Sequence, residues 1–148
     1  MNSKSTFATV LYVEDEENDA LFMQRAFTSV GLGSALRLVD DGRAALEYLS
    51  GTGAYRDREQ YPVPTVVLLD LHLPGLSGFE VLNWMRKNPD YAAMPVVVFS
   101  SSPREEDRQQ ARELGANEFV EKPRSAMKFA EVVRGLREKW LLSGEAAD

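Results

Sequence analysis

The sequence contains no cysteine, a single histidine and no hydrophobic run of the length that crosses a bilayer. The missing cysteines exclude disulfide bonds and thiolate metal sites, and one histidine is too few for a metal site built from several imidazoles. Residues 1–10 also lack the apolar core of a signal peptide. These absences predict a soluble, cytoplasmic protein that does not bind membranes.

The charge balance disfavours nucleic acid as a partner. The chain has 17 Lys and Arg residues against 23 Asp and Glu residues, and its formal net charge is −6. Binding to nucleic acid depends on clusters of basic residues that neutralise phosphates, and here the basic residues are scattered. Proteins and small cations are therefore the expected partners.

Five short apolar segments alternate with segments of helical period, which is typical of an α/β fold. The segments TVVLL and PVVVF are apolar throughout, as in parallel strands that are buried on both faces. The length of the chain suits one domain. Strands are predicted at residues 8–13, 35–39, 65–69, 95–99 and 117–120.

Two segments stand out from this regular alternation. Residues 102–105, Ser-Pro-Arg-Glu, fit a capping box with proline at the first helical position. The helix that follows has little apolar surface beyond Ala111 and Leu114, so we expect it to be weakly held. Residues 50–64 form a long polar connection, which is either a tolerated insertion or a contact for a partner protein.

Polar side chains follow the predicted strands at the ends where parallel sheets bind their ligands. Glu14 and Asp15 follow the first strand, Asp70 the third, Ser100 the fourth and Lys122 the fifth. Three carboxylates at one edge repel one another unless a hard cation such as Mg²⁺ neutralises them. A phosphoryl group could then bind to the metal, the ammonium and the hydroxyl, and Asp70 could be the nucleophile that receives it.

The other acidic residues near the first strand have a different explanation. Glu16, Glu17 and Asp19 fall in the first turn of the following helix. A carboxylate there interacts favourably with the helix dipole, by about 0.3–1 kcal/mol. We therefore assign Glu14 and Asp15 to the metal and these three residues to the helix.

Four motifs together resemble the response-regulator receiver domain of two-component signalling. They are VEDEENDA, LLDLHLPGLSGFEVL, PVVVFSSS and FVEKP, in this order and at the family's spacing. The resemblance covers nearly the whole chain. The long connection and the segment NPDYAAMPVVVFSSS are most similar to stand-alone receivers that serve phytochrome-type sensor histidine kinases.

The resemblance implies a flavodoxin-like receiver fold, a doubly wound five-stranded parallel sheet in the order 2-1-3-4-5. Residues 1–148 would form a single receiver domain, with a core at about residues 8–142 and no output domain. Such a protein catalyses its own phosphorylation and slow dephosphorylation, and no turnover of an external metabolite is expected. It signals through protein contacts, with a downstream protein, a phosphotransfer partner or a second copy at the face of the fourth helix, fifth strand and fifth helix.

The family's active-site roles carry over to individual positions. Asp70 would accept the phosphoryl group from a kinase phosphohistidine. Glu14, Asp15 and Asp70 would hold Mg²⁺ together with the backbone carbonyl of His72, whose ring is not expected to bind metal. Lys122 would pair with the phosphoryl group.

The resemblance also implies a switch and a control of lifetime. Ser100, where threonine is commoner, would turn towards the phosphoryl oxygen, and Phe119 would turn inward with it. His72 and Ser102 would tune how fast water removes the phosphoryl group. The bond between Lys122 and the following proline is usually cis in such domains.

Three alternatives belong to other functional classes. A magnesium-dependent phosphohydrolase often carries Asp-x-Asp after one strand, but here the motif reads Asp70, Leu71 and His72. A flavin-binding module needs a phosphate loop rich in glycine and hydroxyls, and residues 14–17 would repel that phosphate. A receiver-like scaffold that is never phosphorylated is the third alternative, although all five chemical positions hold competent residues.

Overall fold

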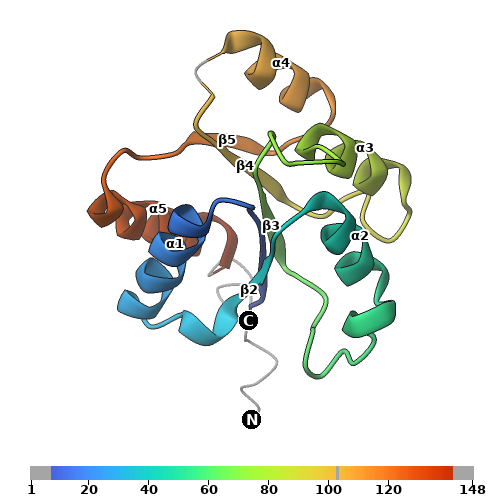
Figure 1. Ribbon diagram of the computed structural model, residues 1–148, viewed down its shortest axis with the longest axis horizontal. Helices are drawn as coiled ribbons and strands as arrows, with labels where there is room; N and C mark the ends of the chain where they lie inside the picture. Colours follow the sequence, from blue (N-terminus) through green and yellow to red (C-terminus); the bar gives the residue numbers. More distant parts are fainter. Residues whose placement is uncertain (1–7, 103, 142–148) are drawn as a thin grey trace.

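A parallel β-sheet lies between two layers of helices (Figure 1). This arrangement comes from a computed structural model that describes residues 8–102 and 104–141. The strands lie in the predicted order, β2-β1-β3-β4-β5, and each begins one or two residues later than expected. They are β1 (Val10–Val13), β2 (Leu36–Val39), β3 (Val66–Leu69), β4 (Val96–Ser100) and β5 (Glu118–Glu121).

The helices form a separate layer on each face of the sheet. Helices α1 and α5 cover one face, and α2 and α3 cover the other (Figure 1). The main helices are α1 (Glu17–Ser29), α2 (Gly42–Ser50), α3 (Gly78–Lys87), α4 (Glu105–Glu113) and α5 (Phe129–Leu136). Shorter turns are η2 (Gly33–Ala35), η3 (Gly53–Tyr55), η4 (Ala126–Lys128) and the π-helical η5 (Arg137–Leu141).

Side chains along the central strands point alternately to the two faces of the sheet, so each face has its own apolar core. In β1, Leu11 and Val13 pack towards α2 and α3, whereas Val10 and Tyr12 pack towards α1 and α5. All four are fully buried, as is every residue of β3. The continuous apolar runs in the sequence therefore reflect burial on both faces, as predicted.

The helix N-termini differ from the prediction. A capping box is present at α3, where Ser77 accepts the backbone N–H of Glu80 and the Glu80 carboxylate accepts the N–H of Ser77. The predicted capping box at α4 is wrong, because Ser102 donates its hydroxyl proton to Asp107 and α4 begins at Glu105 without a side-chain cap. The predicted proline position, residue 103, lies outside the described residues.

Helix α4 has the small apolar surface that its sequence predicts. Only Asp107 and Ala111 are buried within it, and Leu114 packs partly against the core just beyond its end. By contrast, α1, α2, α3 and α5 each bury three or four residues. Helix α4 is thus the helix with the least burial to lose if it moves.

The long connection between α2 and β3 is held against the end of α2 by Arg58. Its guanidinium donates to the backbone carbonyls of Tyr48, Leu49 and Tyr61, at 2.9, 2.9 and 3.0 Å. The rings of Tyr48, Tyr55 and Tyr61 pack against one another, with centroids 5.1–5.9 Å apart. The segment is therefore an ordered part of the fold.

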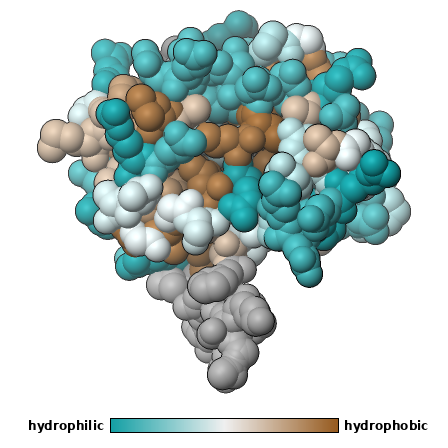
Figure 2. Space-filling view, turned by 60° about the horizontal axis from the view of Figure 1, so that its bottom comes forward, coloured by the Kyte–Doolittle hydropathy of each residue, from teal (hydrophilic) through white to brown (hydrophobic). Residues whose placement is uncertain are grey.

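Apolar residues also reach the surface. Figure 2 shows hydrophobic residues gathered in the middle of one face and surrounded by hydrophilic ones. The exposed large hydrophobic side chains of the described residues are Leu21, Val63 and Met127. Within the same residues, no helix has both the length and the apolar character needed to span a bilayer.

Replacing Arg58 with methionine should destabilise the protein. The substitution keeps much of the aliphatic stem but leaves three carbonyls without their charged donor, which should lower the free energy of unfolding by about 1–3 kcal/mol. Urea unfolding followed by circular dichroism measures the change. Arg56→Met, at an exposed neighbouring position, is the control, and equal losses in the two variants would contradict a specific role for Arg58.

Candidate functional site

The carboxyl ends of the strands bring the predicted site residues to one edge of the sheet. Backbone pairing continues one residue past the strands, since the N–H of Asp70 donates to Val13 O at 3.2 Å and that of Lys122 donates to Ser100 O at 2.9 Å. Parallel register therefore aligns residues that are far apart in sequence. Gly78 allows the loop after Asp70 to stay close, because a Cβ there would lie 2.0 Å from the Asp70 carbonyl oxygen.

Lys122 lies at the centre of this edge. Its ammonium is 2.8 Å from Glu14 Oε1, 2.8 Å from Asp19 Oδ2 and 3.1 Å from Asp70 Oδ2. The Lys122 side chain is only 7% exposed. One buried positive charge is thus shared among three carboxylates.

Three carboxylates have the arrangement of a site for a hard cation. Oxygens of Glu14, Asp15 and Asp70 all lie within 4.8 Å of one another. Glu14 and Asp70 are buried, whereas Asp15 is exposed at the rim. Lys122 alone cannot neutralise this much negative charge, so an all-oxygen donor set of this kind fits a divalent ion such as Mg²⁺.

Burial and repulsion perturb the titration of the site. Burial, followed by the charge of Asp70, raises the pKa of the Glu14 carboxyl to about 7, although Lys122 and the Tyr12 hydroxyl oppose the rise. For Lys122, burial lowers the pKa, but its hydrogen bonds to Asp19 and Glu14 outweigh this, and the pKa lies above its usual value. The lysine therefore stays charged.

Sequence reasoning missed two residues of this cluster. Asp19 was assigned only to the helix dipole, yet its carboxylate accepts a hydrogen bond from Lys122. The Tyr12 hydroxyl donates to Glu14 Oε1 at 2.8 Å. The contact between Tyr12 and Glu14 could have been predicted from the sequence, because residues two apart on a strand point to the same face.

A hydrogen-bonded bridge connects the loops after β3 and β4. His72 Nε2 lies 3.0 Å from Asp107 Oδ2, and the Ser102 hydroxyl donates to the same oxygen at 2.6 Å. The bond from Ser102, assisted by His72, holds the pKa of Asp107 below its usual value. The His72 ring is thus hydrogen-bonded to Asp107, a residue that sequence analysis did not single out.

Ser100 is the last residue of β4, and Phe119 lies within the neighbouring edge strand, β5. The buried Ser100 accepts the backbone N–H of Ser102 at 3.2 Å. Phe119 is partly exposed, and the guanidinium carbon of Arg108 on α4 lies 4.5 Å from the centre of its ring. This is a cation–π distance, so α4 covers the aromatic ring.

The bond between Lys122 and Pro123 is trans, as are all peptide bonds of the described residues. The cis bond implied by the resemblance is therefore wrong for this structure. The lysine reaches the cluster nonetheless, because its three carboxylate partners fix the direction of its side chain.

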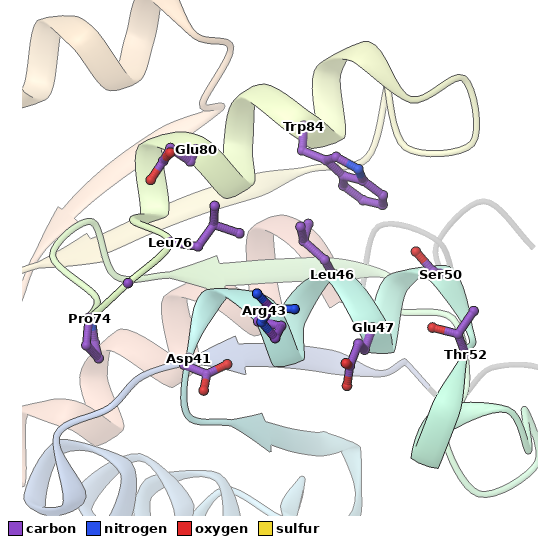
Figure 3. A pocket seen from close by; sticks show the side chains of 11 residues that line it. Asp41, Arg43, Leu46, Glu47, Ser50, Thr52, Pro74, Leu76, Glu80 and Trp84 are labelled. Carbon is purple, nitrogen blue, oxygen red and sulfur yellow. The ribbon is translucent and has the colours of Figure 1, made fainter.

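A separate hollow of about 700 Å³ lies between α2 and α3 (Figure 3). Leu46, Leu76 and Trp84 line it, and carboxylates such as Glu47 and Glu80 border it. No predicted site residue lines this hollow. The acidic edge, and not this hollow, holds the converging chemical groups.

Comparison with protein families gives one match along most of the chain. The family model of the response regulator receiver domain matches residues 10–134. Among characterised proteins, the response regulator Rcp1 of Synechocystis sp. is 35% identical over 132 residues, covering 89% of this chain and 88% of Rcp1.

Solved structures give the same result. The Mn²⁺-bound form of Rcp1 has a TM-score of 0.79 at 34% identity and covers 90% of this chain and 94% of that one. The phosphorylated cyanobacterial phytochrome response regulator RcpA has a TM-score of 0.83 at 31% identity, covering 92% and 95%. RPA3017, a response regulator in red light signalling of R. palustris, has a TM-score of 0.83 at 31% identity, covering 90% and 94%.

The raised pKa of Glu14 predicts how the metal-free protein responds to pH. Between pH 4.5 and about 7, folded Glu14 keeps a proton that the unfolded chain has released. The folded state then binds more protons, so its stability relative to a Glu14→Gln variant should fall as the pH rises. Urea unfolding with a chelator measures this difference.

Addition of Mg²⁺ provides the control for this pH effect. Above pH 7 the metal should stabilise the wild type and have little effect on Glu14→Gln, because binding to the folded state shifts unfolding by mass action. A stability difference that is independent of pH, or equal stabilisation of both proteins by Mg²⁺, would contradict the assignment.

Proposed function

This chain belongs to the response regulator receiver family, and we propose that it is a phosphorylation switch in which Asp70 accepts a phosphoryl group from a histidine kinase. The observation that carries the proposal is the buried Asp70 carboxylate, 3.1 Å from the Lys122 ammonium and within a metal-compatible cluster. A nucleophilic carboxylate, a fixed cation and a metal site are the parts that phosphoryl transfer requires.

Glu14, Asp15 and Asp70, with the backbone carbonyl of His72, would hold Mg²⁺. The similarity to Rcp1, which has been solved with Mn²⁺, supports a divalent ion at this position. When bound, the metal neutralises negative charge on the phosphoryl oxygens. The chain's own contribution is to hold these oxygen donors close together despite their repulsion.

In the proposed transfer, an Asp70 oxygen attacks the phosphorus of a phosphohistidine while the bond to the imidazole nitrogen breaks. Lys122 is already placed beside Asp70 and would pair with the new phosphoryl oxygens. Ser100 would donate its hydroxyl to another oxygen. The catalytic contribution of the chain is alignment and charge screening, which suits self-phosphorylation without turnover of an external metabolite.

The change at Asp70 would spread through two polar contacts. If Ser100 turns towards the phosphoryl group, the backbone N–H of Ser102 loses its acceptor. If Phe119 turns inward, it leaves the guanidinium of Arg108. Both contacts involve α4 or the loop that precedes it, so phosphorylation would shift the equilibrium between two positions of α4.

We place the signalling surface on α4, β5 and α5. A downstream protein, a phosphotransfer partner or a second copy would bind there. The similarity to RcpA and to RPA3017, proteins of phytochrome and red light signalling, supports a phytochrome-type histidine kinase as phosphodonor.

The proposal has three further parts. The protein would act in the cytoplasm and as a single receiver domain. His72 and Ser102 would set the lifetime of the phosphorylated state.

Incubation with acetyl phosphate and Mg²⁺ should add one phosphoryl group to the wild-type protein. Intact mass spectrometry measures the addition. Asp70→Asn, which keeps the shape of the side chain but removes the nucleophile, should add none, and neither should the wild type with a chelator. Addition to Asp70→Asn would place the acceptor elsewhere, and no addition to the wild type would favour the scaffold alternative.

Phosphorylation should also increase self-association through the α4–β5–α5 face. Sedimentation velocity of the protein with and without acetyl phosphate measures the fraction of dimer. Val132→Arg, on the partly exposed surface of α5, should reduce the dimer, whereas Val63→Arg in the long connection should not. A monomer at all concentrations in both states would refute dimerisation.

A further inference from the structure

The proposed switch gives no role to Asp107, although this carboxylate is buried in α4 and contacts two residues near the site. Asp107 is 7% exposed. A single oxygen, Oδ2, receives both the Ser102 hydroxyl and His72 Nε2. Burial of a charged group is unfavourable without partners, so such a residue is expected to hold something in place.

We propose that Asp107 is a positioning residue that holds the His72 ring across the mouth of the site and thereby prolongs the life of phosphorylated Asp70. The inference rests on the proposed function, since it concerns the hydrolysis of the product of that reaction. It goes further by assigning the control of lifetime to a residue of α4, the helix that the switch moves.

The geometry makes Asp107 the main restraint on this ring. The His72 side chain is 58% exposed, and the neighbouring aromatic ring, Phe79, lies 6.1 Å away between centroids. An ionised carboxylate can only accept, so His72 must carry its proton on Nε2 and donate it to Asp107. Without that acceptor, the ring has little to fix its side-chain rotamer.

The bridge joins two loops that border the site. His72 lies two residues after Asp70, and its backbone N–H donates to Asp70 Oδ1 at 3.3 Å. Ser102 lies two residues after Ser100 and donates its N–H to the Ser100 hydroxyl. Asp107 therefore connects the loops that follow the phosphorylated residue and the switch residue.

Hydrolysis of the aspartyl phosphate needs a water molecule in line with the bond that breaks. The water oxygen forms a bond to phosphorus, the bond from phosphorus to the Asp70 oxygen breaks, and its electron pair stays on the Asp70 carboxylate. The proton lost by the water goes to the phosphate that leaves. A ring held over the mouth of the site restricts the approach of this water, so release of the ring should speed the reaction.

The first test observes the ring itself and needs no phosphorylation. Because the chain has one histidine, ¹³C labelling of histidine Cε1 gives a single ring signal. Its NMR relaxation should show a restrained ring in the wild type and fast internal motion in Asp107→Leu. Asp107→Asn, whose amide oxygen can still accept, should stay restrained. Equal ring motion in wild type and Asp107→Leu would overturn the inference.

The second test measures the rate of dephosphorylation after the phosphodonor is removed. Asp107→Leu should lose the phosphoryl group roughly threefold to tenfold faster than wild type, the range expected for losing one hydrogen bond of ordinary net strength. Asp107→Asn should stay within about twofold of the wild type, because its amide oxygen can still accept the hydrogen bond from His72. The control is Glu106→Leu, which also removes a carboxylate from the first turn of α4 but is exposed, and its rate should not change.

A double variant separates positioning from damage to α4. In a His72→Ala background, Asp107→Leu should have no further effect, because there is no ring left to hold. An undiminished acceleration in that background, or no acceleration in the wild-type background, would refute the inference alone. Failure of the wild type to take a phosphoryl group would instead refute the proposed function, and the inference with it, so the two failures are distinct.

Discussion

The rest of the structure depends on the charge imbalance around Lys122. One ammonium with almost no exposure to water is shared by Glu14, Asp19 and Asp70, and Asp15 adds a further negative charge at the rim. Like charges stay this close only because two apolar cores fix the strands that carry them. The proposed phosphoryl group would add more negative charge, so its acceptance at this edge would depend on a divalent cation.

Stability is unevenly distributed around the site. The side formed by β1 and β3 is buried on both faces, whereas α4 buries two residues of its own. Besides the apolar contacts of Ala111, polar and cation–π contacts join α4 to Ser102, His72 and Phe119. One polar contact can replace another at a small net cost in free energy, whereas a change in close packing costs more. The rigid half therefore holds the reacting groups, and the polar half can respond to them.

The sheet and the reacting edge could be predicted from the sequence because both follow from periodicity. Strand ends meet at one edge, so Glu14, Asp70 and Lys122 were brought together correctly. Asp19 and Asp107 were missed because acidic residues are common in first helical turns, and the pattern does not show which of several faces inward. The α4 cap was predicted wrongly for a related reason, since the Ser102 hydroxyl donates to Asp107 across the turn and α4 begins only at Glu105, without a side-chain cap.

The hydrogen bonds by which Arg58 holds the long connection go to main-chain oxygens. Every residue type possesses such an oxygen, so the path of this segment depends little on the side chains at its exposed positions, such as Glu59 and Gln60. Substitutions can accumulate there in evolution without changing the shape of the loop. The same freedom makes the segment a natural place to graft a foreign recognition sequence, remote from the chemistry at the opposite end of the strands.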